Sequence, residues 1–247
     1  MTYVPKDKIL FSGGAFRSYS IPEVIFSDES KDLDRYLRFT RKYFANIIGG
    51  FRDWVSKAIS KIVQMNLDIQ VVAPLHGLVW RGNIDRIISY YDNLAKPAIN
   101  MSKIVVIYGS MYGSVEKGVL AIIKALKEKG LSILTYKFTD KEYASASEVI
   151  GEAYDAAALV IGAPTYESSI FPAVKYMVEL IVSKVPAKPI IIVSSYGWGG
   201  VAGKKLSEIF DKHGYEVIDI IEYRGQPNEG VREKITSAVE KLLEKII

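Results

Sequence analysis

The pattern of apolar and polar positions becomes regular only after about residue 100. From there, short runs of aliphatic residues alternate with stretches whose apolar positions recur at helical spacing. Such strand–helix units, with strands that are apolar throughout, predict an α/β fold with a five-stranded, parallel, doubly wound sheet. The expected strands are 103–108, 131–138, 157–161, 189–194 and 216–221, and the expected helices are 115–129, 145–153, 171–183, 203–212 and 229–246.

The first hundred residues follow a less regular pattern. Two short strands are expected at Thr2–Val4 and Lys8–Ser12, with a turn between them. The remaining elements are expected as a helix at 32–48 that Gly49-Gly50 ends, a second helix at 51–63, a strand at 69–73 and a helix at 83–94. A linker at 95–102, which contains Pro97, then predicts two domains, 1–100 and 101–247.

Composition excludes several classes of site. The chain has no cysteine, so disulfides, thiolate metal sites and cysteine nucleophiles are excluded, and its two histidines offer little for histidine chemistry. The net charge of +4 is mild and basic residues are interspersed with acids, so nucleic acid is a poor partner. We expect no membrane span and, because the N-terminus lacks an apolar signal segment, a cytoplasmic protein.

The strand that ends at Gly109 predicts an anion site. A short loop of small and hydroxyl residues follows, and a helical pattern has begun by Glu116. The first N–H groups of a helix have no internal partner, and the helix dipole favours negative charge there. Ser110 and Ser114 add hydroxyl donors, so we expect this loop to hold a phosphate.

Two further loops follow expected strands and place aromatic residues among small ones. They are Gly162-Ala163-Pro164-Thr165-Tyr166-Glu167 and Ser195-Tyr196-Gly197-Trp198-Gly199-Gly200. Ligands of doubly wound sheets lie beyond the carboxyl ends of the strands. A flat ring between these two loops, with its phosphate in the first, is the expected arrangement.

Two other nucleotide motifs compete with this interpretation. Gly113 and Gly118 have the glycine spacing of a P-loop, but no lysine follows Gly118, so that motif fails. Gly197-x-Gly199-x-x-Ala202 follows a strand and opens a helix, with Asp219 about twenty residues on, which fits a loose dinucleotide fingerprint. It leaves the other two loops unexplained. A third alternative is that these glycines only permit tight turns.

Residues 103–247 resemble the flavodoxin-like domain of the flavodiiron (A-type) flavoproteins, on the three loops just quoted. The resemblance implies FMN as cofactor, with its phosphate in the first loop and its ring between Tyr166 and Trp198 or Tyr196. One departure is Val115, where the family usually has a threonine hydroxyl. The implied cofactor residues are Ser110, Met111, Tyr112, Gly113, Ser114, Val115, Ala163, Pro164, Thr165, Tyr166, Glu167, Ser195, Tyr196, Gly197, Trp198, Gly199 and Gly200.

The first domain resembles only the second half of that family's metallo-β-lactamase-like αββα domain. The segment around His76 looks like the one that bears the family's last histidine ligand. The bridging aspartate of the family falls at about Gly14, which has no side chain to offer. A diiron centre needs several converging ligands, so we expect no metal site in this chain. His213 is expected to end a helix, with Gly214 as the C′ residue.

The resemblance implies an FMN-binding electron-transfer protein that lacks a complete diiron site. The alternatives are one subunit of a split flavodiiron oxygen or nitric oxide reductase, and a flavin-dependent reductase of small molecules. Electrons would come from a redox partner protein or an NAD(P)H-linked reductase.

Half of an αββα domain would expose an apolar face, so a homo-oligomer or a complementary chain is expected. Part of an aromatic stripe, otherwise helix core, is a candidate for that interface. The stripe comprises Tyr36, Tyr43, Phe44, Phe51 and Trp54.

Overall fold

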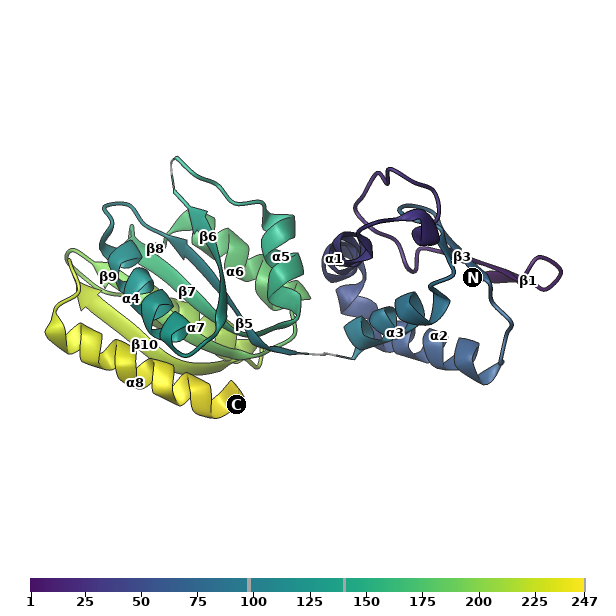
Figure 1. The fold of residues 1–247 in the computed structure, drawn as a ribbon. Helices are drawn as coiled ribbons and strands as arrows, with labels where there is room; N and C mark the ends of the chain where they lie inside the picture. Colours follow the sequence, from purple (N-terminus) through teal and green to yellow (C-terminus); the bar gives the residue numbers. More distant parts are fainter. Residues whose placement is uncertain (97–98, 140, 247) are drawn as a thin grey trace. The chain divides into compact units, whose positions relative to one another are not determined.

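The computed structural model describes residues 1–96, 99–139 and 141–246 (Figure 1). The chain divides into two compact units, 1–98 and 99–247, and each is described by itself. Pro97 of the expected linker lies outside the described residues. Among the helices described, none is long and apolar enough to cross a membrane.

The second unit is built on a parallel sheet. Its main strands lie in the order β10-β9-β7-β5-β6, and every neighbouring pair among them is parallel. In chain order this is the flavodoxin-like arrangement 2-1-3-4-5, so the predicted fold class is confirmed. The strands are β5 Asn100–Gly109, β6 Ser132–Phe138, β7 Ala156–Tyr166, β9 Pro189–Tyr196 and β10 Glu216–Arg224.

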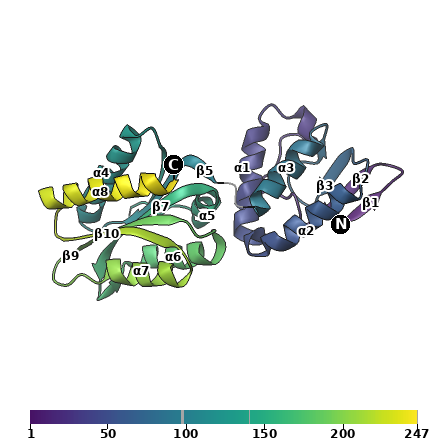
Figure 2. The ribbon, with the colours of Figure 1, turned by 90° about the horizontal axis from the view of Figure 1, so that it is seen from below.

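Helices cover both faces of this sheet. Helices α4 (Ser114–Glu128) and α8 (Glu229–Ile246) pack together on one face, while α6 (Pro172–Lys184) and α7 (Ala202–Lys212) lie on the other (Figure 2). Helix α5 (Ala146–Tyr154) packs against α6. The central strands explain this layering, because residues 104–108 of β5 are all fully buried and successive side chains point to opposite faces.

The carboxyl ends of the strands extend further than the sequence pattern predicts. Strand β7 continues to Tyr166, and its end turns back into a short strand β8 (Ser169–Ile170) that was not predicted. The two turn residues, Glu167 and Ser168, have φ values of +45° and +55°. This is the geometry of a type I′ hairpin, which normally carries Asn or Gly, so the usual sequence signal was missing.

The first unit has a four-stranded sheet in the order β1-β2-β3-β4. Strands β2 and β3 are parallel and the outer pairs are antiparallel. The strands are β1 Thr2–Val4, β2 Ile9–Gly13, β3 Val71–Pro74 and β4 Trp80–Arg81. The helices are α1 Leu33–Tyr43, α2 Arg52–Gln64 and α3 Ile84–Ala95, with irregular helical turns at Ser27–Glu29 and at Phe44–Phe51 between α1 and α2. Strand β4 and the turn at 27–29 were not predicted.

Aromatic side chains pack in the core of the first unit. Of the predicted aromatic stripe, some residues are buried in this core and others are exposed. The rings of Phe16 and Phe44 lie 4.6 Å and 4.9 Å from that of Tyr91. Phe44 is fully buried, as Tyr36 and Tyr43 nearly are. Phe51 and Trp54 are instead 63% and 72% exposed. The stripe is therefore helix core in its first part only.

A buried lysine joins three backbone carbonyls at the amino ends of the strands in the second unit. Lys188, immediately before β9, donates from Nζ to the carbonyls of Ala153 (2.6 Å), Tyr154 (3.1 Å) and Ala156 (2.8 Å). The first two are in the last turn of α5, whose carbonyls lack helical partners. Burial lowers the pKa of Lys188 to about 7. Donation to three carbonyls uses all three N–H groups of the ammonium form, and these hydrogen bonds fasten the end of α5 to the sheet.

We predict that Lys188→Met lowers the free energy of unfolding by about 2–4 kcal/mol, because buried carbonyls lose their donor. Urea unfolding measures this loss. Lys127→Met, at an exposed position on α4, is the matched control and should change stability by less than about 0.5 kcal/mol. Equal stability of the two variants would contradict the assignment.

Candidate functional site

The three predicted loops meet at one end of the sheet in the second unit. Tyr108 of β5 pairs with Gly162 of β7, and Gly162 pairs with Val193 of β9. The loops that follow these strands therefore begin at the same level. They surround a cavity of about 690 Å³, which has room for a cofactor. Its lining residues are Ser110, Met111, Tyr112, Ser114, Val115, Pro164, Thr165, Tyr166, Glu167, Ser168, Ser195, Tyr196, Gly197, Trp198, Gly199, Val201 and Gly225.

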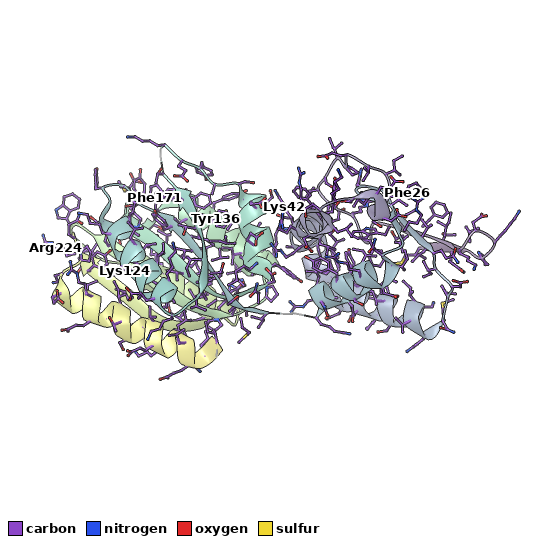
Figure 3. The ribbon with its side chains drawn as sticks, viewed as in Figure 1. Phe26, Lys42, Lys124, Tyr136, Phe171 and Arg224 are labelled. Carbon is purple, nitrogen blue, oxygen red and sulfur yellow. The ribbon has the colours of Figure 1, made fainter. Side chains whose placement is uncertain are left out.

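The first loop presents unpaired donors beside this cavity. Gly113 precedes α4 with a φ of +77°, a conformation that favours glycine. Within the part of the chain that the structure describes, the N–H groups of 111–115 donate to no acceptor. Such unpaired donors, together with the helix dipole, favour an anion at this place. Gly109, the last residue of β5, leaves room for the ring of Phe171, which Figure 3 labels, since a Cβ on it would lie 2.6 Å from that ring.

Val115 contributes to this loop through its backbone. Its isopropyl group is 1% exposed and packs in the core beside Val119. A Cβ at Gly162 would lie 3.0 Å from Val115 Cγ1, so the close packing extends to the second loop. The hydroxyl that the family's threonine would bring is absent, while the N–H group of Val115 remains available to an anion.

The third loop differs from the first because its helix N-terminus already has acceptors. Thr165 Oγ1 accepts hydrogen bonds from the N–H groups of Val201 (3.1 Å) and Ala202 (3.2 Å). Glu222 Oε2 accepts from the N–H of Gly203 at 3.3 Å. A pyrophosphate at the start of α7 would have to displace a carboxylate. The geometry therefore argues against the dinucleotide alternative.

Aromatic side chains stand at the rim of the cavity with little protein contact. Trp198 is 98% exposed and Tyr112 is 86% exposed. Tyr166 is held more firmly, because its ring meets that of Phe171 edge-on at 6.0 Å. An indole with no protein contact above a cavity is suited to stack on a flat ligand.

A carboxylate network anchors the start of α4 to the sheet. The Tyr108 hydroxyl donates to Glu116 Oε1 at 2.6 Å, and Lys137 Nζ lies 2.9 Å from the same oxygen. These bonds, that from Tyr108 first, lower the pKa of Glu116. Glu116 in turn raises the pKa of Lys137, and burial raises the pKa of Tyr108 to about 12. The three groups thus keep their ordinary neutral-pH protonation states.

The cavity brings together most of the residues predicted from the sequence, with three exceptions. Gly113, Ala163 and Gly200 do not line it. Ala163 is fully buried within β7, Gly113 makes the turn before α4 and offers its N–H group beside the cavity, and a Cβ at Gly200 would lie 2.6 Å from Glu222 Oε1. The lining residues that sequence reasoning missed, Ser168, Val201 and Gly225, belong to the unpredicted hairpin, the start of α7 and the end of β10.

Comparisons with known proteins agree with this architecture. No protein-family model matches the chain. It is 32% identical over 208 residues to the Nitric oxide reductase of Moorella thermoacetica, covering 84% of this chain and 51% of the relative. A variant of the Flavo Di-iron protein from Thermotoga maritima superposes with a TM-score of 0.88 at 30% identity, covering 98% of this chain and 60% of that one.

The chain is a relative of the flavodiiron proteins. The Rubredoxin oxygen:oxidoreductase of Desulfovibrio gigas, with a TM-score of 0.92 at 23% identity, supports the shared fold alone. This relative of the flavodiiron proteins spans about half the length of the curated proteins that it matches. The α/β class, with lactamase-like and flavodoxin-like parts, is therefore confirmed.

The first unit of this flavodiiron relative holds little that could bind metal. Among the described residues no group of three or more His, Cys, Asp or Glu is placed to hold an ion. Gly14 has open space where a Cβ would lie, yet carries no ligand. Nearby, the Arg17 guanidinium donates to the Gly13 carbonyl (3.0 Å) and the Tyr43 hydroxyl (3.2 Å). His76 is exposed beyond β3. These residues do not fit a diiron centre.

His213 has the structural role that the sequence predicted. It is the C-cap residue of α7, and its N–H bonds to the carbonyls of Asp211 and Phe210. Its Nδ1 lies 2.8 Å from the Ile209 carbonyl oxygen, and Gly214 follows with a φ of +77°. The prediction of a helix-ending histidine is confirmed.

We predict that Glu116→Gln lowers the free energy of unfolding relative to wild type, and that this loss is larger at pH 7 than at pH 3. The pKa of Glu116 lies below its ordinary value of 4.5 in the folded chain, so the carboxylate stabilises the fold above that pH. The contribution is lost as the pH falls through the folded-state value. Since the side chain is 35% exposed, we expect a cost of about 1 kcal/mol or less at pH 7, and a smaller one at pH 3.

Urea unfolding of both proteins at the two pH values measures this difference. Glu128→Gln, at an exposed position in the last turn of α4, is the matched control. Its effect on the free energy of unfolding should be about the same at both pH values. A cost of Glu116→Gln that does not shrink in acid would contradict the network.

Proposed function

We propose that this chain is an FMN-binding electron-transfer protein, related to the flavodiiron proteins, that lacks a complete diiron site. The observation that carries the proposal is the set of unpaired N–H groups at 111–115 beside a cavity rimmed with aromatic residues. An anion site alone fits many ligands. An anion site next to exposed Trp198 and Tyr112 fits a phosphate attached to a flat ring.

The residues present fit FMN. The N–H groups of the first loop, with the hydroxyls of Ser110 and Ser114, would hold the phosphate, and Tyr166 with Trp198 or Tyr196 would enclose the ring. FMN when bound supplies uptake and release of one or two electrons. The protein's own part is to bind and orient, which requires no acid–base residue. Electrons would come from a redox partner protein or an NAD(P)H-linked reductase.

We predict that the purified protein is yellow or quenches FMN fluorescence on titration, and that Trp198→Ala weakens FMN binding about tenfold through lost stacking. Trp198→Ala should weaken riboflavin binding equally, since the ring is common to both ligands. Trp54→Ala, which changes the other strongly exposed tryptophan outside the cavity, is the matched control. A colourless preparation that leaves flavin fluorescence unchanged would refute the proposal.

The second candidate is one subunit of a split flavodiiron reductase whose remaining metal ligands lie on another chain. The observation in its favour is His76, which is exposed and occupies a segment that resembles a ligand-bearing one. Gly14 and the Arg17 guanidinium argue against it, because the missing carboxylate belongs to this chain. Stoichiometric iron in the same preparation, with a copurifying chain, would reverse the ranking.

We further propose that the chain associates with itself through the first unit. Large apolar side chains are exposed there, including Ile47 (50%), Phe51 (63%) and Trp54 (72%), which lie at the start of α2 and just before it. A contiguous patch of exposed apolar side chains marks an interaction site, and we propose that these residues form one.

The double substitution of Phe51→Lys with Trp54→Lys should therefore shift the protein to a smaller mass in light scattering, because like charges would replace apolar contact. Leu120→Lys, at a half-exposed position on α4, is the control and should leave the mass unchanged. A wild-type protein that is already monomeric would contradict the association.

A further inference from the structure

The segment Tyr223–Gln226, at and just beyond the end of β10, touches two of the three cavity loops. Its members reach the first loop at Ser114 and the third loop at Tyr196 and Gly197. Nothing in the sequence motifs marks this segment. Its contacts nonetheless link the loop assigned to a phosphate with a loop assigned to a ring. Arg224, labelled in Figure 3, lies at this edge of the unit.

Tyr223 holds the backbone of the first loop. Its hydroxyl donates to the Ser114 carbonyl at 2.8 Å. A Cβ at Gly118 would lie 2.4 Å from that hydroxyl, so glycine in the second turn of α4 makes the contact possible. Burial raises the pKa of Tyr223 to about 12, and the hydroxyl therefore stays a donor at neutral pH.

Gln226 acts on the side chain of the same serine. Its Nε2 donates to Ser114 Oγ at 3.0 Å. A serine hydroxyl has one proton and two lone pairs, so an oxygen that accepts from Gln226 turns its own proton elsewhere. Ser114 lines the cavity next to the unpaired N–H groups of the first loop. The hydroxyl proton is thereby left to an anion in that loop.

The remaining two residues hold the third loop. Gly225 donates from its N–H to the Tyr196 carbonyl at 2.9 Å, and Arg224 Nε donates to the Gly197 carbonyl at 2.9 Å. Gly225 has a φ of +65°, which favours glycine at this bend. One short segment thus sets the spacing between the first and third loops.

We propose that Gln226 is a positioning residue that makes the cavity selective for a flavin bearing a terminal phosphate monoester over the same flavin without it. The proposal rests on the proposed function, because it assumes that a flavin occupies the cavity. Gln226 acts through Ser114, whose hydroxyl it orients as a donor. A charge-assisted hydrogen bond from that hydroxyl is lost when the orientation is lost.

The test compares the dissociation constants of FMN and riboflavin, measured by flavin fluorescence, for wild-type protein and the variant Gln226→Met. The expected result is a roughly tenfold fall in the preference for FMN, with riboflavin affinity unchanged. Gln226→Glu should lower the preference further, because the carboxylate would accept the hydrogen bond of the Ser114 hydroxyl and would repel the phosphate. Gln64→Met, the same change at an exposed position on α2, is the matched control and should keep the wild-type preference.

Each other outcome overturns the proposal in an identifiable way. An unchanged preference in Gln226→Met, or an equal loss of affinity for both flavins, would show that Gln226 has no phosphate-directed role while leaving the flavin site intact. Wild-type protein that binds neither flavin would overturn the proposed function and this inference together. Thermal unfolding of each variant separates a folding defect, which would weaken both ligands, from a change of preference.

Discussion

The site in the second unit depends on one constraint, which is that the first N–H groups of α4 have no partner within their own helix. The strand register brings the ends of β5, β7 and β9 level, and residues that carry these donors line the cavity there. Gly113 allows the turn, and Glu116 ties the helix start to Tyr108 and Lys137. The sheet and the network keep the donors in place, and the open cavity keeps them accessible to an anion.

The first N–H groups of α4 and α7, which start at this edge of the sheet, have different partners. At α7, Thr165 and Glu222 satisfy the N–H groups, so that loop is fixed in shape and repels further negative charge. At α4, no acceptor among the described residues takes the donors of 111–115. The small and aromatic residues that both loops contain do not distinguish the two helix N-termini. The distribution of acceptors on neighbouring strands does.

The sequence predicted the order of strands and helices and the three loops, because buried parallel strands produce continuous apolar runs. It could not predict contacts that join distant segments. The bonds from Tyr223 and Gln226 to Ser114 span more than a hundred residues, and the β7–β8 turn lacks its usual glycine. The sequence also could not predict that Phe51 and Trp54 are exposed, because helical spacing alone does not show which face of a helix packs against its neighbours.

A metal centre and a flavin site require different side chains from the unit that holds them. A dinuclear metal centre needs several anionic or imidazole ligands to offset its charge. The first unit offers a glycine at the expected carboxylate position and a partly buried guanidinium close by, whose positive charge would oppose a bound dication. The proposed flavin site instead asks for an anion site and a flat-ring cavity, and the unpaired N–H groups and exposed aromatic side chains of the second unit suit these needs. The proposed flavin site and the segment that resembles a metal site lie in different units and share no residue, so the lack of metal ligands in the first unit leaves the cavity of the second unit unaffected.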